Sequence, residues 1–199
     1  MGIKLLHTAD LHLGVSFKSF GDFGRTVRET LKETFSKVID LAVHEKVDVI
    51  LIAGDLFDSN DAPSSLVRYV TEQFRRIHRI PICVLPGTHD CYSTDSVYRR
   101  QEFEGLRDVF IFKSGAPETK CFSELGLAIH GRANLTNQGA CSSLEGLKPD
   151  SRARFNVAIA HAAIKIPGRH NEMCYTVGLE EIEESKFDYI ALGDWHKCK

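Results

Sequence analysis

The sequence has no long apolar run, and its amino terminus has no targeting signal. Among its 199 residues, no apolar stretch approaches the ~20 residues that a membrane-spanning helix requires. The amino terminus has no basic stretch followed by an apolar segment, and it lacks the Ser or Thr of a myristoylation signal. We therefore expect a cytoplasmic protein that makes no membrane contact.

Paired cysteines are also absent. The six cysteines are scattered, with no two separated by only two residues, so the sequence predicts neither a zinc knuckle nor a disulfide framework. We expect free thiols, as is usual in a reducing compartment. They are Cys83, Cys91, Cys121, Cys141, Cys174 and Cys198.

The chain carries no excess of positive charge. A net charge of −2 is not the electrostatic pattern of a nucleic-acid-binding protein, which normally has a strongly basic face. Bound metal ions add local positive charge that a count of residues omits, so this observation does not exclude a nucleic-acid substrate.

The sequence is instead built from alternating strand and helix patterns. Hydrophobic content of 43% and charged content of 26% are typical of a globular protein, and the length suits one domain over residues 1–199. Strands alternating with helices predict an α/β fold with parallel pairing through right-handed crossovers. We expect strands at 3–6, 47–53, 81–85, 109–112, 125–129, 155–160 and 187–192, helices at 26–46 and about 64–78, and a loop with a helical turn at 134–151.

Five predicted strands end in side chains that can bind a metal ion. In an open α/β sheet, sites form at the carboxyl ends of strands, so residues far apart in the sequence converge there. A single Gly-Asp or strand-terminal His is usually a turn or a core residue, but five such endings together indicate a site. They are Asp10 with His12, Asp55, His89 beside Thr88, His161, and Asp194 with His196.

Histidines mixed with carboxylates suit first-row transition metals. Two such ions about 3.5–4 Å apart can clamp a phosphate and activate a hydroxide, which predicts hydrolysis of a phosphoester. We predict that Asp55 bridges the two ions. His89 follows a Pro-Gly turn and fits stabilisation of the leaving group as a general acid. Asp90 either orients a neighbour or, as we favour, caps the following turn.

These motifs resemble the calcineurin-like metallophosphoesterases. Within that family, His7–Gly14 and Gly54–Asp58 resemble the SbcD/Mre-type DNA repair nucleases. The resemblance implies a two-sheet α/β sandwich flanked by helices, with the metal site at the carboxyl ends of strands. It also implies two divalent ions, usually Mn²⁺, action on DNA ends, an SMC-like ATPase partner of the SbcC type, and a possible homodimer.

Matched motif by motif, the resemblance assigns metal ligands. Asp10, His12, Asp55 and His196 match the ligands of one metal, and Asp55 with His161 matches ligands of the second. The family continues beyond the motif of His196 into further strands and a capping domain that grips DNA, so we expect this chain to be a truncated core.

Two residues depart from the family pattern, and both fall on the second metal. Thr88 stands where the family has Asn, and Asp194 stands where it has His. A hydroxyl is a weaker ligand than an amide carbonyl, and a carboxylate is harder than an imidazole. We expect a preference for hard ions such as Mn²⁺ or Mg²⁺ and a weakened second site. The competing interpretation is a natural subfamily in which Asp194 is a true ligand and activity is intact.

The sequence thus predicts a metal-dependent DNA phosphodiesterase, with two alternatives open. One is hydrolysis of a small phosphoester such as a cyclic nucleotide; the other is a catalytically weak metal-binding scaffold for a partner ATPase. Three further features have a structural interpretation as well as a functional one. Arg75 and Arg76 either contact nucleic acid or sit at a helix end, His130 lines the site or lies in the core, and Tyr69 with Val70 belongs to a dimer face or the core.

Overall fold

The first sheet is built around the apolar run Val49–Ala53, every residue of which is buried. The computed structural model describes residues 2–17, 21, 23–139, 141–165 and 174–194. All pairs in this sheet are parallel. In sheet order, its strands are β1 (Leu5–Thr8), β2 (Val49–Ala53), β3 (Ile82–Leu85) and β4 (Val109–Ile111). Parallel neighbours require crossover connections, which helices supply.

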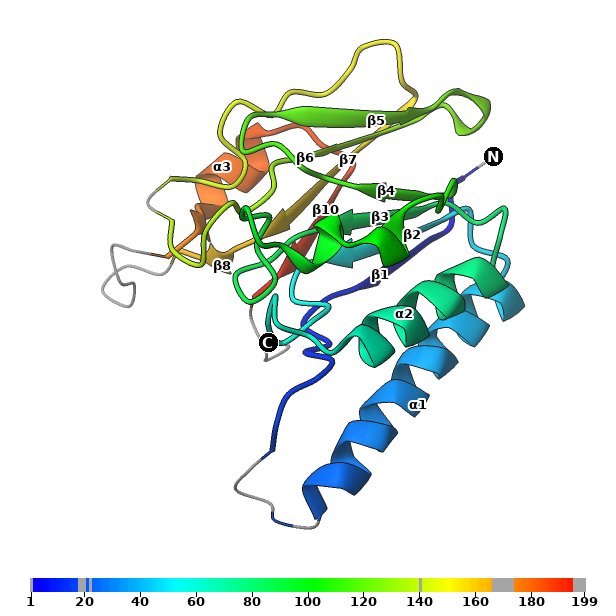
Figure 1. The fold of residues 1–199 in the computed structure, drawn as a ribbon. Coiled ribbons are helices and arrows are strands. Elements are labelled where there is room, and N and C mark those ends of the chain that lie inside the picture. Colours follow the sequence, from blue (N-terminus) through cyan, green and yellow to red (C-terminus); the bar gives the residue numbers. More distant parts are fainter. Residues whose placement is uncertain (1, 18–20, 22, 140, 166–173, 195–199) are drawn as a thin grey trace.

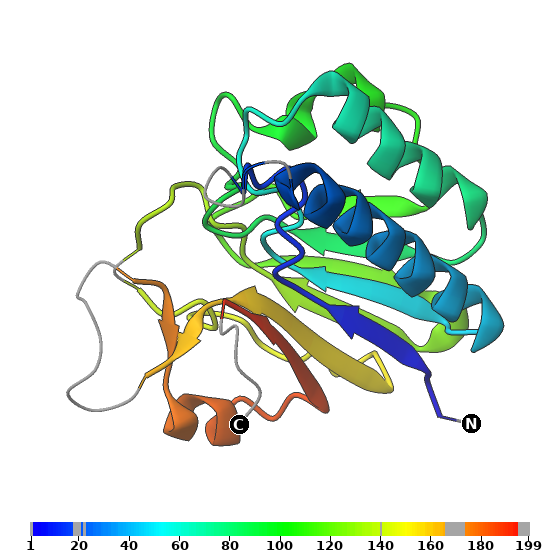
Figure 2. The same cartoon turned by 90° about the horizontal axis from the view of Figure 1, so that it is seen from below.

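Two helices, α1 (Phe23–His44) and α2 (Ser64–Arg76), make the first two crossovers and cover one face of this sheet (Figures 1 and 2). Each buries an apolar stripe, of which Phe35 and Ile39 on α1 and Val70 and Phe74 on α2 are examples. Within the described residues, no helix combines the length and the hydropathy that crossing a membrane would take.

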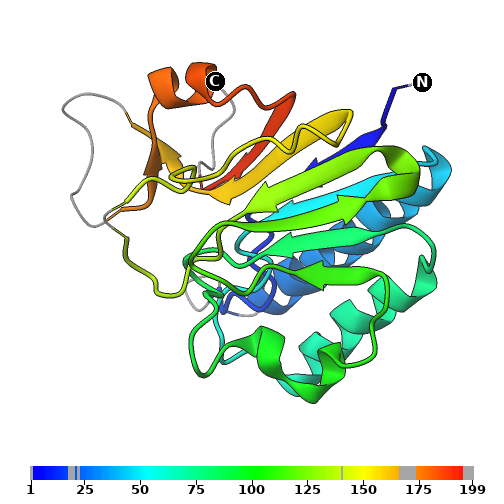
Figure 3. The same cartoon turned by 90° about the horizontal axis from the view of Figure 1, so that it is seen from above.

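A second four-stranded sheet lies on the other side of the first, as Figure 3 shows. Its order is β10 (Tyr189–Gly193), β7 (Phe155–His161), β6 (Leu127–Gly131) and β5 (Glu118–Phe122). Only β5 runs antiparallel to its neighbour. The other elements of the described residues are the strands β8 (Ala163–Ile164) and β9 (Thr176–Val177), the helix α3 (Leu179–Glu184), and the short 3₁₀ helices η2 (Val97–Arg99), η3 (Gln101–Phe103) and η4 (Ser123–Leu125).

The two-sheet α/β sandwich with helices is therefore confirmed, with differences at particular elements. Strand β5 and helix α3 were not predicted. The strand expected at 125–129 begins two residues later, because η4 extends to Leu125 and the next residue, Gly126, takes the left-handed conformation with φ of 60°. The described part of 134–151 is loop with turns, which agrees with the predicted loop with a helical turn.

Val70 lies in the core, and Tyr69 is partly buried and packs against it. Val70 is fully buried, and the Tyr69 hydroxyl donates a hydrogen bond to the carbonyl of Lys32 on α1 at 2.7 Å. Parallel pairing brings the carboxyl ends of β1, β2 and β3 to one edge of the first sheet, and those of β6, β7 and β10 to one edge of the second. The loops that follow these strands contact one another at that edge.

Candidate metal centre

Backbone hydrogen bonds join the loops that carry the predicted ligands. The amide of Asp10 donates to the carbonyl of Gly54 at 3.1 Å, and the amide of His12 donates to the carbonyl of Asp55 at 2.9 Å. The amide of Asp194 donates to both carboxylate oxygens of Asp10, each at 3.0 Å. The ends of β1, β2 and β10 are therefore fixed relative to one another.

Four predicted ligands have left-handed backbone conformations. Their φ angles are 55° at Asp10, 43° at His12, 51° at Asp55 and 92° at Asp194. Such angles are unfavourable for residues with a Cβ, and they gather at functional sites where surrounding contacts enforce them.

Asp55 lies at the centre of the group and is 2% exposed. Its Oδ1 accepts a hydrogen bond from the amide of His89 at 2.8 Å, and its Oδ2 accepts one from the hydroxyl of Thr88 at 3.3 Å. Burial raises the pKa of Asp55, but the neighbouring His161 and the His89 amide outweigh it, so the net pKa is lowered. Asp55 is thus held as a carboxylate.

His161 points at two carboxylates a nitrogen that has no hydrogen-bond partner among the described residues. Its side chain is fully buried, and Nδ1 donates to the carbonyl of Ala53 at 2.9 Å, which leaves Nε2 facing the site. Nε2 lies 3.2 Å from Asp55 Oδ2 and 3.6 Å from Asp194 Oδ1, without the alignment of a hydrogen bond. Burial lowers the pKa of His161, but the charge of Asp55 outweighs burial and raises it to about 9.

A cation between Nε2 and the two carboxylates would be favoured, because both sides offer it lone pairs. A proton can play that part in the metal-free protein, as the raised pKa of His161 indicates. A divalent metal ion fits the same position, because imidazole nitrogen and carboxylate oxygen are common ligands of first-row metals. The residues present therefore fit a bound cation.

The described side chains form two groups with the spacing of metal ligands. The acidic group is Asp10, Asp55 and His161, and the imidazole group is His12, Asp55 and His89. Within each group, one ligand atom from every residue lies within 4.8 Å of the others. Asp55 belongs to both groups, as a bridging ligand must.

This grouping divides the predicted ligands differently from the family resemblance. The resemblance assigns Asp10 and His12 to one metal, whereas here Asp10 groups with His161 and His12 groups with His89. Asp194 lies beside the acidic group through its contact with His161. The predicted ligand His196 lies outside the described residues.

Asp58 is a contributor that the sequence analysis missed. Its carbonyl oxygen lies 3.0 Å from Nδ1 of His89, and its Oδ1 lies 3.4 Å from Nδ1 of His12. The two imidazole rings stand edge to face, with centroids 4.7 Å apart. Asp58 therefore helps to orient both rings. It is the acid that ends the Gly54–Asp58 motif, and that position was the available signal.

Asp90 orients a neighbour, and the favoured prediction that it caps the following turn is wrong: among the described residues, the backbone amides that donate to its carboxylate all precede it in the chain. Its carboxylate is fully buried and accepts hydrogen bonds from the amides of Gly87 at 2.7 Å, Phe57 at 3.0 Å and Asp55 at 3.3 Å. The Tyr98 hydroxyl also donates to it. Burial raises the pKa of Asp90 overall. Through these contacts Asp90 fixes the backbone that carries Asp55.

Two glycines of the motifs are explained by close approach. A Cβ at Gly87 would lie 2.2 Å from Asp55 Oδ1, and a Cβ at Gly54, where φ is 88°, would lie 2.1 Å from His161 Nδ1. No other residue fits at either position without displacing a predicted ligand.

A groove of about 620 Å³ opens beside this centre. Half of the His89 side chain is exposed there. The groove walls are polar and come from the loops after β2, β3 and β6; they include Asp58, Asn60, Thr88, His89, Ser93 and Thr136. His130, in contrast, is a core residue that bonds to Thr119 and Asn156 at 2.9 and 3.0 Å.

A family model described as calcineurin-like phosphoesterase matches residues 3–198. The chain belongs to the calcineurin-like phosphoesterase family. Its two ligand groups, which have the spacing of metal ligands, agree with membership of this family.

Individual relatives of this calcineurin-like phosphoesterase include an "Uncharacterized metallophosphoesterase YhaO" of Bacillus subtilis (strain 168), 31% identical over 98% of this chain and 49% of the relative. Another is the "DNA double-strand break repair protein Mre11" of Sulfurisphaera tokodaii, 29% identical over 97% of this chain and 49% of the relative. The chain therefore spans about half the length of these two relatives.

Among solved structures, the chain is similar to the Pseudomonas putida nuclease MPE. The match covers 98% of this chain and 78% of the nuclease chain, with 15% identity and a TM-score of 0.39.

Proposed function

We propose that this chain is a metal-dependent phosphodiesterase that hydrolyses DNA phosphodiester bonds with two divalent ions, Mn²⁺ being the best match. The observation that carries the proposal is the pair of ligand groups sharing the buried carboxylate of Asp55. A shared carboxylate between two sets of nitrogen and oxygen donors is the arrangement that two-metal hydrolysis needs.

Each ligand residue then has a definite task. Asp55 would contact both ions, Asp10 and His161 would hold the first, and His12 would hold the second. Bound divalent cations supply Lewis acidity, neutralising phosphate charge and acidifying water. Mn²⁺ accepts both the carboxylate oxygens and the imidazole nitrogens of this set.

His89 would act on the leaving group. Nδ1 of His89 is engaged by the carbonyl of Asp58, so its Nε2 is the nitrogen left to face a substrate in the groove. A protonated His89 can donate a hydrogen bond or a proton to the leaving oxygen as the P–O bond breaks. Because His89 also belongs to the imidazole group, the assignment of its role is a specific target for mutation.

DNA as the substrate is supported by similarity rather than by charge. Three of the relatives, at 25–29% identity, carry the name "DNA double-strand break repair protein Mre11". A small phosphoester such as a cyclic nucleotide is the second candidate, because a polar groove of about 620 Å³ also accommodates a single nucleotide.

The test is an assay of three substrates with Mn²⁺: a chromogenic bis-ester, a cyclic nucleotide and linear DNA. We expect hydrolysis of the bis-ester and DNA, and a reduction of kcat by about 100-fold or more in His89→Ala, because general acid catalysis contributes about that much. Hydrolysis of the cyclic nucleotide alone would support the small-substrate alternative. If wild type and His89→Ala were equally inert on all three, a metal-binding scaffold would replace the enzyme proposal.

The partners and location follow from the same proposal. An SMC-like ATPase of the SbcC type, DNA ends, a homodimer and a cytoplasmic location all stay predictions for this chain. Co-purification of the metal-loaded protein with an SbcC-type ATPase would test the first of these.

A further inference from the structure

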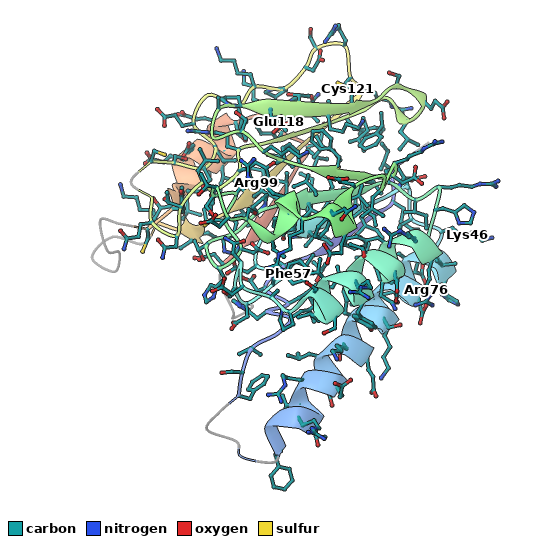
Figure 4. The ribbon with its side chains drawn as sticks, in the orientation of Figure 1. Lys46, Phe57, Arg76, Arg99, Glu118 and Cys121 are labelled. Carbon is teal, nitrogen blue, oxygen red and sulfur yellow. The ribbon has the colours of Figure 1, made fainter. Side chains whose placement is uncertain are left out.

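Arg99 presents its guanidinium group in a fixed orientation on the surface. It is exposed and ends η2, and Figure 4 shows it beside these short helical turns, far from Lys46. Its Nε donates a hydrogen bond to the carbonyl of Ser93 at 2.9 Å, and its Cζ lies 4.2 Å from the centre of the Tyr92 ring. A hydrogen bond and a cation–π contact together restrict a side chain that is otherwise flexible.

The two terminal nitrogens of Arg99 remain available for another partner. Among the residues that the structure describes, no carboxylate lies within ion-pair distance of Arg99. The adjacent Arg100 differs, because its terminal nitrogens donate to the carbonyls of Asn60 and Ala62. Arg100 is thus a structural residue, while Arg99 offers an open pair of N–H donors. That geometry matches the two oxygens of a phosphate.

Arg99 lines one groove and is hydrogen-bonded to a residue that lines another. Ser93, its hydrogen-bond partner, lines the groove of His89, while Tyr92 and Arg99 line a second groove of about 610 Å³. The second groove also contains Phe110 and Lys113.

Two acidic residues, Glu104 and Glu118, line the second groove as well, so it is not uniformly basic. One carboxylate oxygen of Glu118 is already occupied by the amides of Lys113 and Ser114 at 2.9 and 3.2 Å.

We propose that Arg99 binds a phosphate of the substrate strand other than the one that is hydrolysed, so that the strand continues from the groove of His89 into the groove of Phe110. This inference rests on the proposed phosphodiesterase function and adds that the substrate is a polynucleotide longer than one nucleotide. An arginine fork for the phosphate and an aromatic ring for a base are the usual elements of a single-strand binding surface.

The experiment compares binding with turnover in the 199-residue chain. Binding of a fluorescently labelled single-stranded oligonucleotide is measured by anisotropy in Ca²⁺ at several salt concentrations, and turnover is measured on the chromogenic bis-ester in Mn²⁺. We expect Arg99→Ala to weaken oligonucleotide binding about tenfold at low salt. The slope of log binding constant against log salt concentration (the salt slope) should also become shallower by about 1, since one phosphate contact is lost. Turnover of the bis-ester is expected to stay within twofold of wild type.

Two matched variants sharpen the result. Arg99→Lys keeps the charge without the fork, so we expect it to restore the salt slope but only part of the affinity. Arg152→Ala removes an equally charged, exposed arginine that precedes the amino end of β7, and it is expected to leave binding unchanged. Thermal unfolding of each variant shows whether the fold is retained.

Each outcome separates this inference from the proposed function. If Arg99→Ala weakens oligonucleotide binding as expected but wild type hydrolyses no DNA, the phosphate contact of Arg99 stands and the proposed function fails. An Arg99→Ala variant that binds as tightly as wild type, or that loses bis-ester turnover to the same degree as binding, overturns the inference. So does a wild type that does not bind the oligonucleotide at all.

Discussion

The acidic group and the imidazole group share Asp55 but differ in donor chemistry and in exposure. The acidic group has two carboxylates and the fully buried His161, with a third carboxylate from Asp194 beside it. The imidazole group has a single carboxylate and ends in the half-exposed His89. Hard ions prefer the first set of donors, whereas the second also suits borderline ions such as Zn²⁺.

The two groups differ in their position relative to the groove. Backbone hydrogen bonds and the Ala53 carbonyl hold the members of the acidic group in place, and Asp10, Asp55 and His161 are not among the residues that line the groove. The imidazole group borders the groove, where a substrate phosphate would arrive. The sequence predicts that the ion at Thr88, His161 and Asp194 is bound more weakly than the other. That stays a prediction, which the metal-binding experiments below address.

The largest effect is expected from removing the residue common to both groups. Asp55→Asn should lower phosphodiesterase turnover by roughly 1,000-fold or more, because both ions lose a charged ligand at once. Steady-state kinetics on the bis-ester with saturating Mn²⁺ measure this. The exposed Asp95→Asn makes the same change in charge elsewhere and should retain wild-type turnover. An active Asp55→Asn variant would contradict the shared-ligand arrangement.

The buried histidine of the acidic group should also make metal-free stability depend on pH. The pKa of His161 is raised to about 9 in the folded protein and is about 6.5 when unfolded, so protonation stabilises the fold below pH 6.5. In EDTA, we expect the free energy of unfolding to fall by on the order of 3 kcal/mol between pH 6.5 and 9. Urea denaturation across that range measures it.

His161→Gln is the control for this pH dependence. It should flatten the fall in stability between pH 6.5 and 9, because glutamine does not titrate. Mn²⁺ affinity should change in the opposite direction and rise with pH, since the ion competes with the proton for Nε2. If the free energy of unfolding fell equally steeply with pH in wild type and in His161→Gln, His161 would not be the group responsible for the pH dependence.

The smallest change concerns the ion preference of the acidic group. Asp194→His replaces a hard oxygen with a softer nitrogen 3.6 Å from His161, so the ratio of Zn²⁺ to Mn²⁺ affinity should rise about tenfold. Calorimetric titration with each ion gives that ratio. An unchanged ratio would mean that Asp194 does not act as a ligand. The acidic group would then have only one carboxylate more than the imidazole group, that of Asp10.

The convergence of the ligands was predictable because strand ends are visible in the sequence. Asp55, His89 and His161 each follow an apolar run, and parallel pairing brings such ends together. The family resemblance supplied the assignment of ligands to metals, which spacing alone did not provide.

What could not be predicted depends on contacts between distant segments. The role of Asp58 requires knowing that the loop after β1 lies against the loop after β2, and the hydrogen bond from Tyr98 to Asp90 depends on where η2 packs. Strand β5 was missed because Glu118–Phe122 is short, polar and partly exposed, so it has no strong apolar pattern. The division of Asp10 and His12 between two groups depends on backbone angles that sequence spacing does not determine.

The most direct test of the two-metal account is a crystal structure grown with Mn²⁺ and analysed by anomalous scattering. The account predicts two peaks about 3.5–4 Å apart, both within bonding distance of the Asp55 carboxylate. The two ions can share one oxygen of Asp55 or bind one oxygen each. One peak should lie against Asp10 and His161, and the other against His12. A single peak, or two peaks of which one does not touch Asp55, would contradict it.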